Sequence, residues 1–247
     1  MRISRLFLPG DYQENQSIAL PKEQAHYALT VLRLKNDYVL EAFNGEGLLA
    51  TGKLIVTSRR TADFQIEKIT EPKTESPLNL TLVQGISRGD RMDYTIQKAV
   101  ELGVTCIQPL ITERCEVKLS EDKIEKRRAQ WQSIAINACE QSGRTVIPQI
   151  RSILNYSTWL EMQTVHDQPF GLVLDPYAKD RLATVQQPPE NIAIHLLIGP
   201  EGGLTDLEVQ QAKQAGLSPV QLGPRILRTE TAGPAVLAIL QSLWGDF

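Results

Sequence analysis

The amino-terminal part of the chain consists of short runs rich in Val, Ile, Phe and Thr, separated by polar turns. These runs predict strands at Ile3–Leu8, Tyr38–Phe43, Leu48–Thr57 and Thr61–Ile69. A helix is predicted over Lys22–Leu34, whose residues favour helices and follow a proline. Gly45 and Gly47 predict a hairpin between two of the strands. Short strands joined by tight turns favour a small β-barrel.

The pattern changes after residues 70–78, a polar stretch with two prolines that is typical of a linker. Helices then alternate with short apolar strands, which predicts a mostly parallel sheet with helices on both faces. We therefore predict an α/β fold with two domains, residues 1–72 and residues 73–247. The predicted strands are Leu80–Val83, Cys106–Ile111, Gly171–Leu174, Ile192–Ile198 and Pro219–Leu222, and the main helices are Asp90–Leu102, Glu121–Ser142 and Gly233–Trp244.

Composition narrows the class of protein further. The 247 residues carry 26 basic and 29 acidic side chains, a formal net charge of −3, which by itself argues against nucleic acid as a partner. Three cysteines are too few for a disulfide framework, and no apolar run reaches the roughly 20 residues of a membrane span. The amino terminus also lacks the apolar core of a signal peptide. We therefore expect a reduced cytoplasmic protein that does not contact membranes.

A glycine-rich turn follows the predicted strand that ends at Ile198. The stretch Leu196–Leu204 reads LLIGPEGGL, and Thr205 and Glu208 after it have the spacing of a capping box. Glycines at the carboxyl end of a strand let a ligand approach bare backbone, at the edge where open α/β sheets bind ligands. A tight connecting loop without a ligand explains the pattern equally well. Because Glu201 would repel a phosphate, the turn suits a cationic or neutral ligand better.

The stretch Leu222–Gly233, LGPRILRTETAG, also follows a short apolar strand. Thr229 or Thr231 is predicted to cap the next helix, with Pro234 in its first turn. If both loops end neighbouring strands, they form one pocket whose polar side chains are Glu201, Arg228 and Glu230. The alternative for Arg228 and Glu230 is an ordinary surface ion pair, which stabilises little.

Other polar groups give weaker signals. Arg91, Tyr94, Lys98 and Glu101 share one face of a predicted helix, opposite an apolar stripe, although such a face is most often simply solvated. His26, His166 and His195 lie far apart, and no Cys/His cluster has metal-ligand spacing, so no metal site is predicted. His195 is expected to be a packed core histidine. No cysteine has a local motif that would activate its thiol.

Together these motifs resemble the SPOUT superfamily of knotted RNA methyltransferases. The likeness is strongest to the family that methylates N3 of a uridine in small-subunit (16S) ribosomal RNA. It covers essentially the whole chain in the expected order, and the motifs show no departure that would indicate an inactive member. The matching segments are IGPEGG (Ile198–Gly203), LGPRILRTETA (Leu222–Ala232), KAVELG (Lys98–Gly103), ERCEVK (Glu113–Lys118), ACEQSGR (Ala138–Arg144) and Arg5-Leu6-Phe7 before the barrel.

This resemblance implies properties that composition does not reveal. The cofactor would be S-adenosyl-L-methionine, the C-terminal domain would contain a trefoil knot, and the N-terminal domain would be a PUA-like, RNA-binding β-barrel. The protein would act as a homodimer with active sites at its interface. The residues implied to hold the cofactor are Ile198, Gly199, Gly203, Leu222, Gly223, Ile226, Leu227, Thr231 and Ala232.

Methylation of uracil at N3 sets chemical requirements for the site. N3 becomes a good nucleophile only after losing its proton, and the charge then spreads to the flanking carbonyl oxygens. The site therefore needs a proton acceptor near N3 and a cation or amide donors nearby. We assign the acceptor to Glu230 or Glu201 and the stabilising cation to Arg228, leaving the choice of base open.

RNA binding would involve local clusters of basic residues. Residues 1–72 hold 9 basic and 9 acidic side chains, so the predicted barrel has no net charge to attract RNA in bulk. A structured target, the small ribosomal subunit or its RNA, is therefore expected to bind more tightly than arbitrary RNA. The predicted RNA contacts are Arg5 on the barrel and Arg88, Lys98, Arg114 and Arg144 around the pocket, with the helix run Lys123, Lys126, Arg127 and Arg128 as a further candidate.

Two other functions are compatible with the sequence. A SPOUT enzyme could modify a different position, such as a ribose 2′-O of transfer RNA. A non-catalytic RNA-binding protein could use its second domain only to dimerise. Adenosylmethionine binding separates the non-catalytic protein from the enzymes, and mapping of the methylated nucleotide separates the two enzymes.

Overall fold

The computed structural model describes residues 3–118, 120–163 and 170–247, which form two compact units. The first unit comprises Met1–Glu75 and Cys139–Ile147, and the second comprises Ser76–Ala138 and Pro148–Phe247. The sequence analysis placed residues 139–147 in the second domain. His166, considered above as a metal ligand, lies outside the described residues.

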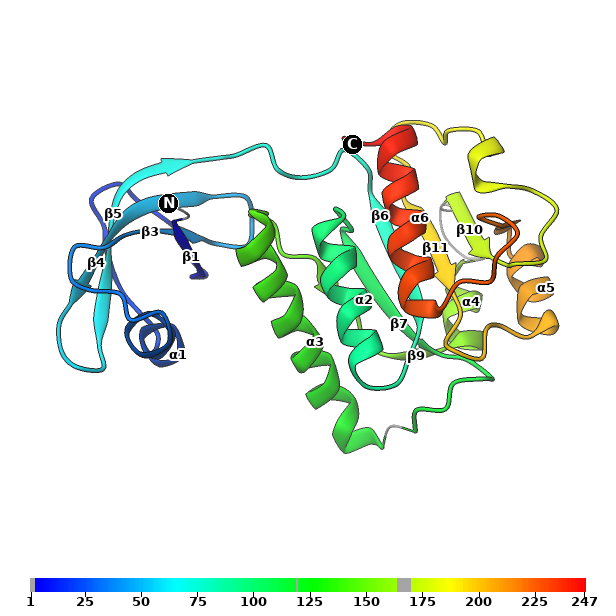
Figure 1. Cartoon of the computed structure of the whole chain (residues 1–247), viewed down its shortest axis with the longest axis horizontal. Coiled ribbons are helices and arrows are strands. Elements are labelled where there is room, and N and C mark those ends of the chain that lie inside the picture. The colour runs from blue at the N-terminus through cyan, green and yellow to red at the C-terminus, as the bar shows by residue number, and fades with distance from the viewer. Residues whose placement is uncertain (1–2, 119, 164–169) are drawn as a thin grey trace. The chain divides into compact units, whose positions relative to one another are not determined.

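The first unit contains a five-stranded sheet in the order β1-β3-β4-β5-β2 (Figure 1). Its strands are β1 (Ser4–Phe7), β2 (Ser17–Ala19), β3 (Val39–Phe43), β4 (Leu49–Val56) and β5 (Ala62–Thr70). β1 runs parallel to β3, and the other pairs are antiparallel. The four predicted strands are confirmed. The sequence analysis missed β2, which is three residues long and mostly exposed.

The predicted helix over Lys22–Leu34 is also present in this unit, in two parts. It begins as α1 (Lys22–His26) and continues as a π-helical turn over Tyr27–Val31. Ala25 and Ala28 of these two parts are buried in the same core cluster as strand residues such as Leu54 and Phe64. The helix therefore closes one side of the small sheet domain.

Residues 139–147 join this unit through the turn between β3 and β4. Gly45 has a φ of +86°, and an added Cβ would lie 2.8 Å from the Ile147 side chain, so glycine permits the close approach. The backbone amide of Ile147 donates to the Gly45 carbonyl, and that of Gly47 donates to the Thr145 carbonyl. These bonds attach the segment to the hairpin that Gly45 and Gly47 predict.

The second unit contains a seven-stranded sheet in which every described pairing is parallel. The order is β12-β10-β11-β6-β7-β8, and β9 also pairs with β7. The predicted parallel sheet is confirmed. Its strands are β6 (Leu80–Gly85), β7 (Cys106–Ile111), β8 (Gln149–Ile150), β9 (Leu154–Asn155), β10 (Phe170–Leu174), β11 (Ile194–Ile198) and β12 (Ser218–Val220).

Helices cover both faces of this sheet, as the alternating pattern predicts (Figure 1). On one face, Val83 and Leu197 pack with residues of α4 (Tyr156–Gln163) and α5 (Asp206–Gln214) in one core cluster. On the other, α2 (Asp90–Glu101) packs against α6 (Thr229–Trp244). The long helix α3 (Glu121–Ser142) follows β7, and a short 3₁₀ turn, Leu182–Thr184, lies between β10 and β11. The apolar stripe predicted on α2 is buried: Met92, Ile96, Ala99 and Val100.

The starts of α5 and α6 differ in how well the sequence predicts them. The capping box is present at α5, where the Thr205 hydroxyl accepts from the Glu208 amide and the Glu208 carboxylate accepts from the Thr205 amide. α6 begins four residues before its predicted start, its N-cap is Arg228 without a side-chain cap, and Pro234 lies inside the helix. The predicted threonine cap is wrong for Thr229, because its hydroxyl donates to the Gly199 carbonyl at 2.7 Å.

The chain that leaves β12 is bonded to the segment connecting β10 with β11. The Gln221 amide donates to the Asp180 carbonyl at 2.9 Å, and the Leu182 amide donates to the Gln221 carbonyl at 3.0 Å. These bonds tie the two connections together, while the trefoil knot itself stays a prediction of the resemblance. In the described part of the chain, no helix is long and apolar enough to cross a membrane.

Candidate functional site

A pocket of about 480 Å³ opens at the carboxyl ends of β10, β11 and β12 in the second unit. Its walls are the loops 174–177, 198–204 and 222–227, with parts of α5 and α6 and the side chain of Arg114. Because the strands are parallel, their carboxyl ends meet at one edge, where open α/β sheets bind ligands. The stretches after β11 and β12 therefore face the same space, although β10 lies between these two strands, which were expected to be neighbours.

Most of the residues predicted to hold a cofactor line this pocket. They are Ile198, Gly199, Gly203, Leu222, Gly223, Ile226, Leu227 and Ala232. Thr231 is exposed in the first turn of α6 and does not belong to the lining. Their roles in binding stay predictions.

Glycines let the loop after β11 fold tightly and expose its backbone. A Cβ on Gly199 would lie 2.8 Å from the Gly203 carbonyl carbon and 2.8 Å from the Leu204 nitrogen, so a side chain cannot fit there without moving backbone. Gly203 and Gly223 have φ values of +70° and +152°, and nothing lies within 4 Å of an added Cβ at either position. The backbone at these two positions is therefore open to a ligand.

A buried amide links this loop to the start of α6. Gln84 of β6 is fully buried, and its Nε2 donates to the Gly199 carbonyl at 3.3 Å and to the Thr229 hydroxyl at 3.0 Å. Thr229 in turn donates to Gly199, which closes the triangle. The sequence analysis missed Gln84, although a polar residue within an apolar strand is a signal worth testing. Such a bonded polar group inside the core orients the two walls of the pocket.

The carboxylates of Glu201 and Glu230 share one arginine of α2. The Arg91 Nη1 lies 2.9 Å from Glu201 Oε1, and its Nε lies 3.7 Å from Glu230 Oε1. Glu201 lines the pocket, whereas Glu230 lies next to it in the first turn of α6. The sequence analysis interpreted the Arg91 face as solvated, because the distance between α2 and these loops is not visible in the chain.

The two carboxylates differ in how fully they are bonded. Glu201 Oε1 also accepts from the Arg88 amide at 2.8 Å. Burial acts to raise the pKa of Glu201, but hydrogen bonds from the Arg88 amide, its own amide and Arg91 outweigh it and hold that pKa below the ordinary value. In contrast, Glu230 Oε2 is buried with no hydrogen-bond partner among the described residues. Glu230 therefore keeps unused acceptor capacity, and Glu201 has less.

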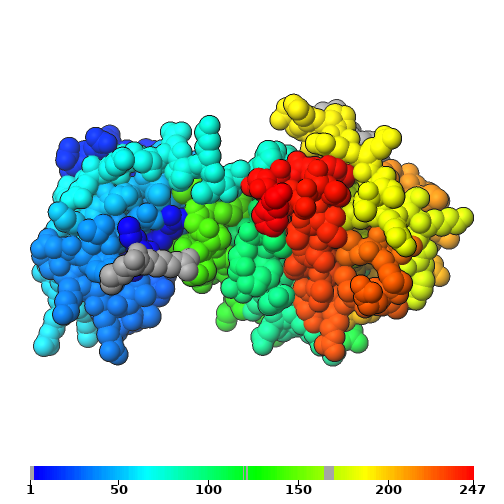
Figure 2. All heavy atoms as spheres, turned by 45° about the horizontal axis from the view of Figure 1, so that its top comes forward, coloured from blue at the N-terminus to red at the C-terminus, as the bar shows by residue number. Residues whose placement is uncertain are grey.

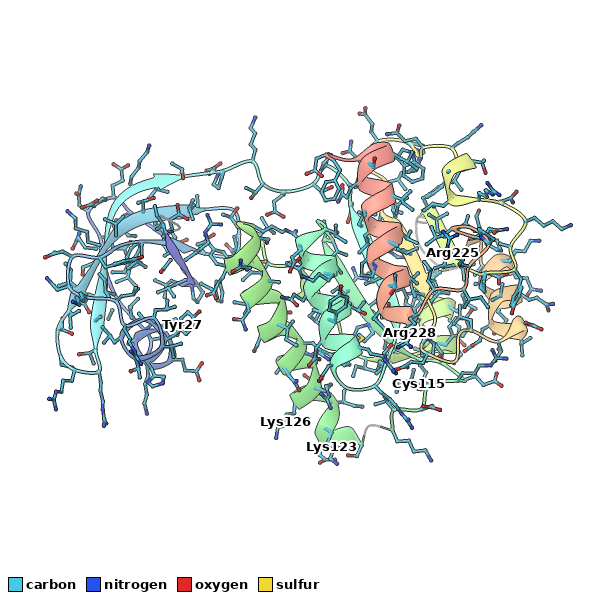
Figure 3. All side chains as sticks on the ribbon, in the orientation of Figure 1. Tyr27, Cys115, Lys123, Lys126, Arg225 and Arg228 are labelled. Atoms are coloured by element: carbon cyan, nitrogen blue, oxygen red, sulfur yellow. The ribbon has the colours of Figure 1, made fainter. Side chains whose placement is uncertain are left out.

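The third predicted catalytic side chain, Arg228, is exposed just before α6 (Figure 3). It makes no ion pair with the described residues and does not belong to the pocket lining. The alternative that Arg228 and Glu230 form an ordinary surface ion pair is therefore wrong. The Arg228 guanidinium is free for a negatively charged or carbonyl-bearing ligand.

The predicted RNA contacts in this unit have protein partners already. Arg88 pairs with Glu116 at 3.0 Å and Lys98 pairs with Glu101 at 2.8 Å, both with partly exposed side chains. Arg114 donates to two carbonyls of the glycine loop and lines the pocket. Exposed ion pairs of this kind are weak, so Arg88 and Lys98 remain accessible to phosphates.

Two predicted RNA contacts in the first unit are largely buried. Arg144 is 4% exposed, and its Nε lies 2.9 Å from Glu75 Oε2. The Arg5 Nη2 lies 2.7 Å from Glu41 Oε2, and only 15% of the Arg5 side chain is exposed. Both guanidinium groups connect parts of this unit, and the burial of Arg144 weighs against its contact with RNA. The sequence analysis could not distinguish these buried arginines from exposed ones.

His195 and the three cysteines are titratable groups outside the pocket lining that bear on a second site, and the pKa of each is shifted by burial. His195 Nδ1 lies 2.8 Å from Gln163 Oε1, and burial, together with the charge of Arg151, lowers the pKa of this histidine to about 4. Burial raises the pKa of all three thiols, to about 12 for Cys139. Within the described ranges, no cluster of three or more His, Cys, Asp or Glu could hold a metal ion.

The fold and the site together define a class of protein. A parallel α/β domain has a pocket lined by glycine-rich backbone at its carboxyl edge, has no lysine in the pocket lining, and follows a separate small sheet domain. These features are those of an α/β enzyme with a site for a small ligand without phosphate and with an added amino-terminal domain.

Comparison with known proteins identifies the family. An RNA methyltransferase domain matches residues 74–241, and an RNA methyltransferase PUA domain matches residues 20–67. The chain belongs to this RNA methyltransferase family.

Individual relatives match along the whole chain. The ribosomal RNA small subunit methyltransferase E of Buchnera aphidicola from Acyrthosiphon pisum is 35% identical, over 100% of this chain and 96% of its own. The Neisseria gonorrhoeae protein of the same name, solved with bound S-adenosyl methionine, is 42% identical, with a TM-score of 0.91 and complete coverage of both chains. A Legionella pneumophila protein solved in complex with the same cofactor is 38% identical, with a TM-score of 0.92 over both whole chains.

The pocket fits S-adenosylmethionine on its own dimensions and chemistry. Its volume lies within the range of about 300–1,000 Å³ that small-molecule sites occupy. Ile198, Leu222 and Leu227 supply apolar walls, and the open backbone at Gly203 and Gly223 supplies hydrogen-bonding groups. The carboxylate of Glu201 suits a ligand that carries a sulfonium and no phosphate.

Proposed function

We propose that this protein transfers a methyl group from S-adenosylmethionine to N3 of a uridine in small-subunit ribosomal RNA. The observation that carries the proposal is the backbone-lined pocket at the carboxyl edge of the sheet, in a chain that matches cofactor-bound relatives along its whole length. The relatives' names supply the ribosomal substrate. The resemblance of the motifs to the uridine-N3 family indicates that N3 is the methylated atom.

The cofactor would lie against the loops 198–204 and 222–227. When bound, it supplies an electrophilic methyl group on its sulfonium sulfur. Backbone groups of Ile198, Gly199, Leu222, Ile226 and Leu227 would hold its adenosine and methionine parts. Room for the cofactor would be left by the small residues Gly203, Gly223 and Ala232, which line the pocket, and by Thr231, which lies outside the lining.

The chain's own side chains would prepare the uracil. A carboxylate would take the proton from N3, which would leave the nitrogen anionic and nucleophilic next to the place where the cofactor would present its methyl group. Glu230 is the better acceptor, because its Oε2 has no partner among the described residues whereas Glu201 already accepts two hydrogen bonds. Arg228 would stabilise the charge on the flanking carbonyl oxygen, a role that its free guanidinium allows.

The proposal includes the partners and the place of action. The first unit, which contains the PUA match, would contact ribosomal RNA, with Arg5 as its predicted contact. Arg88 and Lys98 would contact the RNA from the second unit. Two copies of the chain would form a homodimer with the active sites at its interface, acting in the cytoplasm, where small subunits assemble.

The test is to incubate the purified protein with radiolabelled S-adenosylmethionine and RNA from cells that lack it. Small subunits, free small-subunit RNA and transfer RNA are offered separately, and the product is mapped by nucleoside mass spectrometry. Methylation at N3 of one uridine in small-subunit RNA is the expected result. Ribose methylation of transfer RNA would overturn the substrate assignment, and calorimetry without any heat of cofactor binding would overturn the enzyme assignment itself.

A further inference from the structure

The glycine loop after β11 is held by side chains from the helix α2 and from the loop after β7. Residues 198–204 form the wall of the pocket that touches both α5 and α6. Arg114, from the loop after β7, reaches the backbone of this wall, and Arg91, from α2, reaches its only carboxylate. The contacts connect positions about 90 to 110 residues apart in the chain.

Arg114 bonds to two carbonyl oxygens with one guanidinium nitrogen. Its Nη1 donates to the Gly202 oxygen at 3.0 Å and to the Leu204 oxygen at 3.2 Å. Gly203, whose backbone is open to the pocket, lies between these two residues. The arginine therefore holds both sides of the one position at which the loop turns its bare backbone to a ligand.

The packing at Gly202 shows that this contact is close. A Cβ on Gly202 would lie 2.9 Å from the Arg114 Cβ and 3.4 Å from the Arg114 carbonyl oxygen. Neither of these Arg114 atoms is the far end of a flexible side chain, so a residue larger than glycine would push the loop and the arginine apart. Gly202 has no positive φ, which means that its requirement is one of space.

Other bonds fix the loop that carries Arg114. The Cys115 thiol contacts the Ile86 carbonyl at 3.4 Å, and the Glu113 amide donates to the Glu208 carboxylate at 2.9 Å. The neighbours of Arg114 are thus anchored to the residue that follows β6 and to α5. Its guanidinium has a defined place from which to hold the glycine loop.

We propose that Arg114 is a positioning residue that shapes the glycine loop for the methyl donor, in place of the RNA contact predicted from the sequence. Arg91 serves the same loop through its ion pair with Glu201. The inference rests on the proposed function, because the loop's ligand is S-adenosylmethionine. It assigns to Arg114 a role in cofactor affinity, which a phosphate contact would not have.

Substitutions of Arg114 separate the two roles. Arg114→Lys keeps the charge, but its side chain is one bond shorter than the path to Nη1 and does not reach both carbonyls, so the Kd for S-adenosylmethionine is expected to rise about tenfold, nearly as much as in Arg114→Ala. The KM for the cofactor rises with it, and kcat at saturating cofactor changes much less. Both carbonyls lie at an exposed site where water can replace the arginine, so the variants should fold, which circular dichroism checks.

Lys118→Ala is the matched control, since it removes an exposed cation of the same segment that lies outside the pocket lining. Its cofactor affinity should equal that of the parent. RNA affinity is measured for all variants across a salt series, because a lost phosphate contact lowers the slope of log K against log salt by about 1. The positioning role predicts an unchanged slope for both Arg114 variants.

A second variant approaches the same contact from the loop. Gly202→Ala should raise the Kd for the cofactor by a similar factor, and the double variant with Arg114→Ala should be little worse than either single one. Normal cofactor affinity in Arg114→Lys and Arg114→Ala, or a reduced salt slope, would overturn the inference. If the parent protein itself bound no cofactor, the proposed function would fail instead, so the two failures are distinguishable.

Discussion

The two loops that face each other across the pocket are held very differently. The loop 198–204 is bonded by Gln84 of β6, by Arg88 and Arg114 of two other loops, and by Arg91 of α2. In the facing segment 222–228, three side chains are exposed: Arg225, Ile226 and Arg228. None of the segment's described side chains makes an ion pair. Figure 2 shows part of this segment in orange at the surface. Ile226, an apolar residue of the pocket lining, is 73% exposed.

This difference indicates how the site is organised. One wall is preorganised, so a cofactor pays little ordering entropy to bind against it. The other wall presents an apolar side chain and free guanidinium groups that only a bound cofactor, an RNA or a second subunit would cover. A site with one fixed and one open wall suits a reaction that must admit both a small cofactor and a large RNA.

A side chain added to the loop 198–204, the rigid wall of the pocket, should have the largest effect on cofactor binding. Gly199→Val places carbon atoms where the backbone of Gly203 and Leu204 lies, so we expect no measurable binding of S-adenosylmethionine by calorimetry. Gly233→Ala in α6 is the control, because its Cβ would meet only ordinary contacts of 3.5 Å or more, with side chains of β6 and α2. Retained binding in Gly199→Val would show that the loop is not the fixed wall.

The two carboxylates should respond according to their bonding. We expect Glu230→Gln to lower kcat for methyl transfer by about 100-fold with little change in cofactor affinity, because it removes the unoccupied proton acceptor. Glu201→Gln should lower kcat by no more than about tenfold and should weaken cofactor binding, because Arg91 then loses a charged partner. Single-turnover rates and calorimetry on both variants measure the two effects. The reverse order of kcat losses would exchange the roles of the two residues.

The free energy of unfolding should depend on pH through His195, which lies on the strand that leads into the loop 198–204. His195 lies on β11, and its folded-state pKa of about 4 is lower than the ordinary value of 6.5. The unfolded chain therefore binds this proton more readily, and the free energy of unfolding should fall by up to about 3 kcal/mol as the pH decreases from 6.5 to 4. Urea titrations of the parent and of His195→Gln measure this, and equal slopes against pH in the two proteins would contradict it.

The smallest predicted effect concerns the open wall. Amides of residues 223–227 should exchange with solvent faster than those of β11, and S-adenosylmethionine should slow their exchange by about tenfold or more, by ordering the segment. Hydrogen exchange read by mass spectrometry, with and without the cofactor, makes the comparison. Equal protection of residues 223–227 and of β11 from exchange, before the cofactor is added, would show that the two walls do not differ in order.

Local pattern was enough for most of the secondary structure and for the location of the pocket. The strand β7 and the helix α3 have the bounds that were predicted, because their hydrophobic periodicity and flanking signals agree. The capping box of α5 was visible as two residues at fixed spacing. The start of α6 was not visible in the local pattern, because the Thr229 hydroxyl donates a hydrogen bond to the carbonyl of Gly199, a residue 30 positions away.

The parallel α/β class, the small sheet domain before it and the two loops that meet at one pocket follow from the amino-acid pattern, since each depends on local propensity and on the rule that parallel strands end at a common edge. The folded chain was needed to show that Arg144 is buried in the first unit, that Gln84 joins the loop after β11 to α6, and that Arg91 and Arg114 hold the glycine loop. These roles depend on strand order and on contacts between distant positions. An arginine in a charged stretch has the same local pattern whether it faces solvent, a carboxylate or a backbone carbonyl.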